Sequence, residues 1–215
     1  GHALTLDLTK VADLGADYSA YGIKANNKTT IVVDSNKTNP GKNGTITIKA
    51  KTLWSPSGDS GSKYTAAHGI AVGNFSQRFN KKVSEDLVKT TINADVVIEE
   101  LRGGSIKTTG ISSMDCSDLA INGRFTIKPG AISLMQWNRG DQSKTYGIYM
   151  IGSNNTISIT SADIDDSKNG SLSDLIKTDE SLWGGKTEKN VLRIGGGTLK
   201  VKENQKERYL ISAAK

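Results

Sequence analysis

Ser60 and His68 are the first residues of this sequence whose types suggest a reaction. Ser60 stands within Gly-Asp-Ser-Gly-Ser at residues 58–62, and His68 follows it by eight positions. A nucleophilic serine requires a histidine that takes its proton and a carboxylate that orients the histidine. The one histidine upstream, His2, is typical with Gly1 of the scar left by cleaving an expression tag. The stretch is rich in turn-forming residues and therefore predicts a polar turn.

Acidic residues near position 165 suggest a metal site, but the pattern is incomplete. Asp163, Asp165 and Asp174 fall at positions 1, 3 and 12 of a twelve-residue calcium loop. Position 6, which requires glycine, holds Lys168, and position 12 lacks the bidentate glutamate. One cysteine, Cys116, and one histidine beyond the tag cannot supply a zinc site. We predict no metal, no cofactor and no catalytic residue.

Tryptophans beside polar turns are candidates for ligand binding. Trp54 and Trp183 are followed by Ser-Pro and Gly-Gly pairs, where an exposed indole can stack on a sugar or anchor a protein. The alternative is that both side chains cap the core. We assign Trp54, Trp183, Asp165 and Asp166 as candidate ligand-binding residues; the aspartates have the alternative of a solvated loop over residues 162–170.

Composition predicts an all-β chain. The 215 residues include 23 glycines and 3 prolines, and aromatic residues make up 6%. This balance is typical of short strands joined by tight turns. The net charge is +6, with both signs mixed along the chain. Nucleic-acid-binding proteins usually gather basic residues on one face, and the mixed signs favour a solvated surface instead. Binding to nucleic acid or another anionic polymer through the +6 charge is a third functional class.

A degenerate repeat organises the strands. Residues 21–33 and 146–159 both read Tyr-Gly-Ile, a polar turn and Thr-Ile; residues 68–74 are a partial copy and residues 192–201 a looser one. The first three copies begin at 21, 68 and 146, which fits two turns of ~23 residues and three of ~26. Alternating strands are predicted at residues 45–49, 95–99 and 124–127, and a short helix at 171–177. An all-β sandwich is the alternative fold.

These repeats, their Asn- and Gly-rich corners and the near absence of cysteine resemble the passenger domain of a bacterial type V secreted autotransporter of the adhesin kind. The resemblance covers most of residues 3–215, which we expect to form a single segment after the tag scar at residues 1–2. It implies a right-handed parallel β-helix with protruding loops, for which we expect about nine rungs. It also implies a location on the cell surface or outside the cell, anchored to the outer membrane through a missing C-terminal barrel.

The resemblance implies a non-catalytic function in attachment or bacterial aggregation, in biofilms or virulence. The partner would be a host surface protein or glycan, or another bacterial cell, including self-association. Some members of this secretion family carry a protease with the same Gly-Asp-Ser-Gly-Ser letters, but its histidine and aspartate lie upstream in a separate domain, and this sequence has no room for them.

A polysaccharide lyase or glycoside hydrolase on a pectin-lyase-like β-helix is the alternative function. Such enzymes resemble this sequence in having clustered aspartates, a histidine and an arginine, which Asp165, Asp166, His68 and Arg193 echo. In that family the aspartate pair precedes the histidine, whereas here the histidine comes 97 positions earlier than Asp165. We therefore favour the adhesin.

Overall fold

The computed structural model describes residues 2–8, 19–33, 43–51, 66–73, 87–102, 108–130, 145–168, 172, 174–179, 189–201 and 209–213. Within these ranges the protein is all-β and contains no helix, and so none long and apolar enough to cross a membrane. The strands are β1 (Ala3–Asp7), β2 (Ser19–Ala25), β3 (Thr29–Val32), β4 (Thr45–Lys51), β5 (Ala66–Gly73), β6 (Val88–Asn93), β7 (Asp95–Arg102), β8 (Thr108–Met114), β9 (Ser117–Pro129), β10 (Thr145–Ile151), β11 (Thr156–Asp165), β12 (Asp174–Asp179), β13 (Val191–Ile194), β14 (Gly197–Lys200) and β15 (Tyr209–Ala213).

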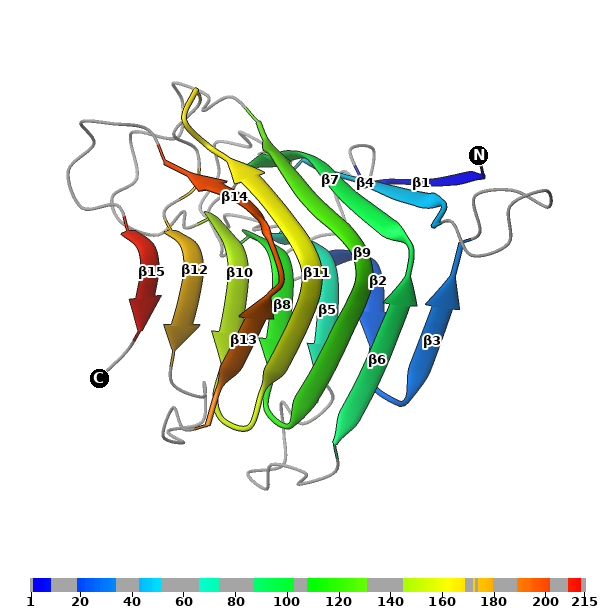
Figure 1. Cartoon of the computed structure of the whole chain (residues 1–215), viewed down its shortest axis with the longest axis vertical. Coiled ribbons are helices and arrows are strands. Elements are labelled where there is room, and N and C mark those ends of the chain that lie inside the picture. Colours follow the sequence, from blue (N-terminus) through cyan, green and yellow to red (C-terminus); the bar gives the residue numbers. More distant parts are fainter. Residues whose placement is uncertain are drawn as a thin grey trace, which may run out of the picture.

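The strands form two sheets, and every described pairing is parallel. Sheet B has the order β15-β12-β10-β8-β5-β2. The nine-stranded sheet A divides into two runs, because the long strands β9 and β11 bend and pair with different neighbours along their lengths. We name these the lower run (β3-β6-β9-β11-β13) and the upper run (β1-β4-β7-β9-β11-β14) after their places in Figure 1. Parallel pairing throughout excludes the antiparallel sandwich for the described strands.

Successive strands visit sheet B, the lower run and the upper run in turn. The sets β2-β3-β4, β5-β6-β7, β8-β9, β10-β11 and β12-β13-β14 are five complete levels, preceded by β1 and followed by β15. In Figure 1 sheet A rises in front and bends over the top, while sheet B descends behind it. This order is consistent with a parallel solenoid.

The length of a level differs from the expected one. Paired residues on neighbouring levels are separated by 28 residues (Tyr146 to Asp174) to 61 residues (Thr29 to Thr90), where turns of ~23 to ~26 residues were expected. The described pairings therefore do not establish a count of about nine rungs. The protruding loops that would absorb the variable lengths lie outside the described residues.

The Tyr-Gly-Ile copies at residues 21, 68 and 146 form a column of sheet B and are in register. Tyr21 pairs with His68, His68 with Thr109, and Thr109 with Tyr146. The offset from 21 to 68 is thus one level, and residues 109–111, Thr-Gly-Ile, are a copy that the sequence reading missed. Residues 192–201 do not belong to this column, because they form β13 and β14 of sheet A.

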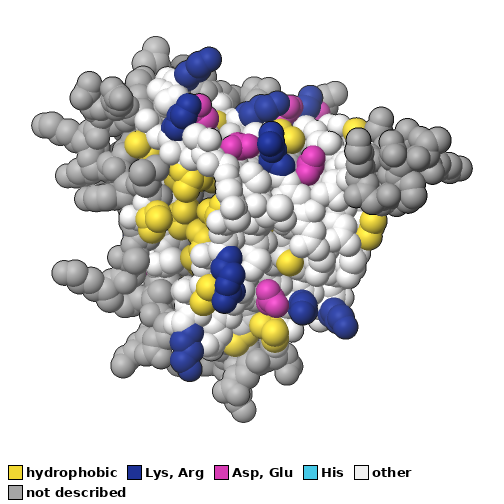
Figure 2. Space-filling view, in the orientation of Figure 1, with side chains coloured by type: hydrophobic (Ala, Val, Ile, Leu, Met, Phe, Trp, Pro, Cys, Tyr) yellow, Lys and Arg dark blue, Asp and Glu magenta, His cyan; other side chains and the backbone are white. Residues whose placement is uncertain are grey.

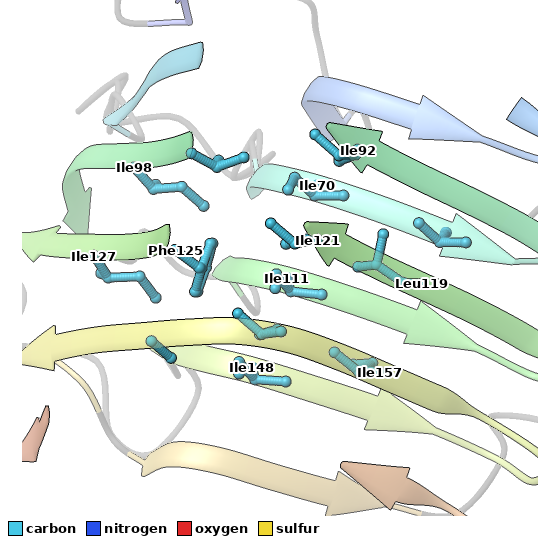
Figure 3. Packing of buried hydrophobic residues seen from close by; sticks show 14 of the residues in the cluster. Ile70, Ile92, Ile98, Ile111, Leu119, Ile121, Phe125, Ile127, Ile148 and Ile157 are labelled. Atoms are coloured by element: carbon cyan, nitrogen blue, oxygen red, sulfur yellow. The ribbon is translucent and has the colours of Figure 1, made fainter. Parts of the chain in front are cut away.

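Isoleucines fill the interior between the sheets (Figure 3). Ile70, Ile111 and Ile148 of sheet B and Ile98 and Phe125 of the upper run are fully buried. Strands β6 and β9 alternate buried with more exposed residues, as the two-residue period of a strand requires. Burying each such side chain contributes roughly 1.5–3 kcal/mol to folding.

Two local predictions need correction, and one is confirmed. Asp174–Asp179 is strand β12 rather than part of a helix at 171–177, because pairing with β10 and β15 outweighs its local preference. Residues 162–165 belong to β11 and not to a loop. An Asn- and Gly-rich corner is confirmed between β10 and β11, where Gly152 has φ 76° and Asn154 φ 60°, in the left-handed region that glycine and asparagine tolerate.

Candidate ligand-binding surface

The structure describes two of the four predicted site residues. Trp54 and Trp183 lie outside the described residues, as does the Gly-Asp-Ser-Gly-Ser stretch. Asp165 ends β11 and is exposed, whereas Asp166 is buried, with 1% of its surface accessible. The two neighbours therefore have different environments and cannot both face a ligand on the surface.

Asp166 has a structural role at the end of β11. Its Oδ2 accepts a hydrogen bond of 2.8 Å from the amide of Leu172, and its own amide donates to the carbonyl of Lys200 at 3.0 Å. A buried carboxylate is tolerated when hydrogen bonds satisfy it. The side chain of Asp166 therefore lies inside the fold, and of the two aspartates only Asp165 faces solvent.

Asp165 faces solvent and interacts with three neighbours. Hydrogen bonds from the Ser167 hydroxyl and from the Ser167 amide (3.0 Å) lower the pKa of the Asp165 carboxyl, and the positive charges of Lys200 and Lys168 lower it further. Lys200 Nζ lies 3.7 Å from Asp165 Oδ2. Asp165 is thus an ionised surface carboxylate with no sign of the raised pKa that a catalytic acid requires.

Asp165 belongs to a column of charged side chains on the outer side of the upper run. The paired positions Asp7–Lys49, Lys49–Glu99 and Glu99–Lys128 join β1, β4, β7 and β9. Ile164 pairs with Ile127, so the next residues along, Asp165 and Lys128, lie side by side. On its other side Asp165 pairs with Lys200. The charges alternate at every step: acid, base, acid, base, acid, base.

Alternation places opposite charges side by side across the whole upper run. Lys128 Nζ donates a hydrogen bond of 3.1 Å to Glu99 Oε1, in addition to the Lys200–Asp165 pair. Opposite charges on directly neighbouring strands stabilise a sheet by a few tenths of a kcal/mol, and like charges destabilise it. Three acids and three bases also make the column neutral as a whole.

A second outward column lies beside the charges and consists mainly of threonine. In strand order it contains Thr5, Thr47, Val97, Thr126, Asp163 and Thr198. Arg124 Nε lies 3.5 Å from Asp163 Oδ2, and the Thr198 amide donates to Asp163 Oδ1 at 3.0 Å. We name these two columns the charged face. Basic and acidic side chains are intermingled along the top of Figure 2, where the upper run lies.

Sheet B carries a separate aromatic and polar row. The rings of Tyr21 and His68 stack with centroids 5.1 Å apart, and Lys24 Nζ lies 4.7 Å from the centre of the Tyr21 ring. His68 Nδ1 and Thr109 Oγ1 share a hydrogen bond of 2.8 Å. Burial, helped by the positive charge of Lys24, lowers the pKa of His68 to about 4, so the imidazole is neutral at neutral pH.

The same row continues into a buried tyrosine pair. The rings of Tyr146 and Tyr149 stack at 4.9 Å, and Tyr149 Oη donates to Asp179 Oδ2 at 3.2 Å. Burial, with the charges of Asp174 and Asp179, raises the pKa of Tyr146 to about 12; burial and Asp179 also raise the pKa of Tyr149. Each tyrosine exposes 2% of its surface, so this part of the row is not open to a ligand.

The candidate catalytic residues of the alternative enzyme lie on different parts of the fold. His68 lies on β5 of sheet B, Asp165 on the upper run and Arg193 on the lower run. General acid–base chemistry requires the reacting groups to share one substrate within hydrogen-bonding reach. Across the described ranges, no cluster of three or more His, Cys, Asp or Glu residues is placed to hold a metal ion.

A buried polar network at the corner between sheet B and the lower run was missed by the sequence reading. Asn155 Oδ1 accepts hydrogen bonds from Ser117 Oγ (2.8 Å) and Ser113 Oγ (3.2 Å). Its Nδ2 donates to Ile151 O and Asn190 Oδ1. The Asn154-Asn155 pair was visible in the sequence, but it predicts a turn and does not indicate the hydrogen bond between the Asn155 and Asn190 side chains. The network satisfies buried polar groups and is structural.

We found no match to this chain among protein-family models, curated proteins or solved structures.

Proposed function

We propose that this chain is a non-catalytic adhesin segment, of the kind that forms the passenger of a type V autotransporter, and that it acts at the cell surface or in secreted form. The fold that goes with this proposal is a right-handed parallel β-helix. Its support is the strand order, in which sheet B, the lower run and the upper run are visited in turn and each strand pairs in parallel with the next level.

The charged face is the observation that carries the functional proposal. Hydroxyl and charged groups recur along it at the interstrand spacing of ~4.8 Å, on a sheet that the buried isoleucines hold rigid. Lys128 pairs with Glu99 on this face, and Lys200 pairs with Asp165. A repetitive array of hydrogen-bonding groups suits an extended partner with many weak contacts, such as a host glycan, a host surface protein or another bacterial cell.

The neutral charge column bears on the class of partner. Binding to an anionic polymer depends on net positive charge and weakens steeply with salt. In the charged column the acids and bases balance, and Asp163 of the second column pairs with Arg124, so attachment there should depend little on salt. An anionic polymer is accordingly the less favoured partner, although the whole chain carries +6.

The test is adhesion of beads that carry many copies of the protein, because single weak contacts are amplified by multivalency. The beads are presented with host matrix, bacterial surfaces and each other. Thr126→Glu places a new charge in the middle of the charged face and should reduce adhesion several-fold. Thr91→Glu is the matched control: Thr91 is an outward threonine in the middle of β6, on the lower run.

Two further arms separate the remaining hypotheses. Trp54→Ala and Trp183→Ala test the predicted aromatic contacts outside the described residues. Incubation with acidic polysaccharides, followed by sizing of the products, tests the enzyme. Release of oligosaccharides that is lost in Asp165→Asn or His68→Ala would refute the non-catalytic proposal, whereas equal adhesion of Thr126→Glu and the unsubstituted protein would refute the charged face as the attachment surface.

A further inference from the structure

The described part of the chain contains three triplets of the form Asn-x-Ser/Thr, which is the acceptor sequence for N-linked glycosylation. They are Asn27-Lys28-Thr29, Asn43-Gly44-Thr45 and Asn154-Asn155-Thr156. Three further triplets, which lie outside the described residues, begin at Asn36, Asn74 and Asn169. A sugar is a bulky group that belongs on the surface, so an acceptor asparagine needs a side-chain amide that solvent can reach. The structure therefore distinguishes among the three described asparagines.

Asn27 and Asn154 occupy the same corner of the fold on different levels. Asn27 lies between β2 and β3, and Asn154 lies between β10 and β11, where the chain passes from sheet B to the lower run. In Figure 1 both corners lie along the lower edge of the molecule. Strands β8 and β5 separate β10 from β2, so the strands that lead to the two corners are three steps, or about 14 Å, apart. Two segments that are distant in the sequence thus present the triplet at one edge.

Both asparagines of this edge are accessible. Each side chain is exposed, and no described residue forms a hydrogen bond with either side-chain amide. Thr29 Oγ1 donates a hydrogen bond of 2.9 Å to the Asn27 carbonyl, which makes a compact turn that holds the hydroxyl of the triplet beside its asparagine. Asn154 has φ 60° and lies at the tip of a tight corner. A substituent on either amide therefore extends into solvent.

The side chain of Asn43 is used by the fold instead. It is half-buried, and its Nδ2 donates a hydrogen bond of 2.6 Å to the carbonyl of Asn122 on β9. A sugar on this nitrogen would have to fit against β9, at the bend between the lower run and the upper run. Asn122 itself is exposed, but it is followed by Gly-Arg and is not part of a triplet.

We propose that Asn27 and Asn154 are acceptor sites for N-linked glycosylation and that Asn43 is not. The Nδ2 atom forms a bond to the anomeric carbon of a sugar that is activated by a phosphate group on that carbon. The bond between the anomeric carbon and the phosphate oxygen breaks, the phosphate leaves with the bonding electron pair, and Nδ2 loses one proton. A separate glycosyltransferase catalyses the transfer from this sugar donor. The modification goes beyond the adhesin proposal and does not rest on it.

The experiment is peptide mass spectrometry of the protein isolated from the cells that produce it. The peptides that contain Asn27 and Asn154 should carry the mass of one or more sugar residues, and the peptide that contains Asn43 should not. Thr29→Val, made in the same cells, removes the hydroxyl of the first triplet and should abolish modification at Asn27 alone. Thr29→Ser keeps the hydroxyl and should retain the sugar, as should Thr30→Val, which changes the neighbouring exposed threonine.

The outcomes separate accessibility from sequence. Unmodified Asn27 and Asn154 in the isolated protein overturn the proposal, and so does a sugar that Thr29→Val leaves on Asn27. Modification of Asn43 to the same extent as the other two would refute the distinction that its hydrogen bond to β9 implies. A sugar on Asn122 would show that exposure alone decides and would refute the role of the triplet. Circular dichroism of each variant establishes that it is folded.

Discussion

His68 makes the stability of the fold depend on pH. Its pKa is about 4 in the folded protein and 6.5 in the unfolded chain, so the unfolded state binds more protons between these values. The contribution of the neutral imidazole is complete above pH 6.5 and is lost progressively as the pH falls toward 4. We expect wild-type stability to fall by roughly 1–2 kcal/mol from this source between pH 7 and 5, allowing for partial exposure of the ring.

Urea unfolding at both pH values measures this loss, with His68→Gln as the control that keeps a hydrogen-bonding group but cannot titrate. The difference between the two proteins isolates the histidine from the carboxylates. Equal pH dependence of both proteins, or an imidazole that titrates near its ordinary pKa by NMR, would contradict the buried neutral state.

The hydroxyl of Thr90 is buried without a hydrogen bond to any described residue, which lowers the stability of the fold. Its side chain is fully buried on β6, and its Oγ1 has no hydrogen-bond partner among the described residues. An unsatisfied buried hydroxyl costs about 1–3 kcal/mol. Thr90→Val, which keeps the shape, should therefore raise the free energy of unfolding by about 1 kcal/mol. Thr91→Val, on the outward side of the same strand, should change it by less than ~0.5 kcal/mol; destabilisation by Thr90→Val would show that the hydroxyl is satisfied after all.

At the scale of the strand, sheet B depends on a column of glycines. Gly22, Gly69, Gly110 and Gly147 follow the paired residues Tyr21, His68, Thr109 and Tyr146. A Cβ on Gly110 would lie 2.5 Å from the carbonyl oxygen of Gly147 and 2.6 Å from Ile127 Cδ1. The glycines therefore let sheet B approach the isoleucines of the upper run, which explains the glycine of the repeat.

Gly110→Ala should destabilise the protein by roughly 1–3 kcal/mol through this overpacking. Gly196→Ala is the matched control, because a Cβ there meets no atom within 4 Å. Thermal unfolding of both variants compares them. A melting temperature of Gly110→Ala equal to that of Gly196→Ala would mean that the sheets do not approach as closely as the structure indicates.

The positions of the strands could be predicted from the sequence more readily than which strands pair with one another. Alternation at residues 45–49, 95–99 and 124–127 predicted strands of β4, β7 and β9, and the Tyr-Gly-Ile copies at 21, 68 and 146 do share one column. The charged face was not foreseen, because Lys49 and Glu99 become neighbours only once the register across 50 residues is known. The burial of Asp166 was missed because the adjacent Asp165 is exposed, and the hydrogen bond that satisfies the Asp166 carboxylate comes from Leu172, six positions away.

At the scale of the whole molecule, the stack of levels is the feature on which the attachment surface depends. Stacking aligns outward residues from distant segments, such as Asp7 and Lys200 at opposite ends of one column. Each level is stabilised by its neighbours through parallel pairing, and a chain with one cysteine, Cys116, has no internal disulfide to add to this. The spacing between neighbouring strands therefore sets the distance between any two residues of a column.

The most direct test of this stack is a pulsed electron paramagnetic resonance distance between spin labels at positions 47 and 198, in a Cys116→Ser background. Thr47 and Thr198 occupy one outward column and are separated by four strand-to-strand steps through Val97, Thr126 and Asp163. We expect a single narrow distribution that corresponds to a backbone separation of about 19 Å, with dilution by unlabelled protein to suppress contacts between copies. A broad distribution, or one that corresponds to about 30 Å or more, the reach of six or more steps, would contradict the stack.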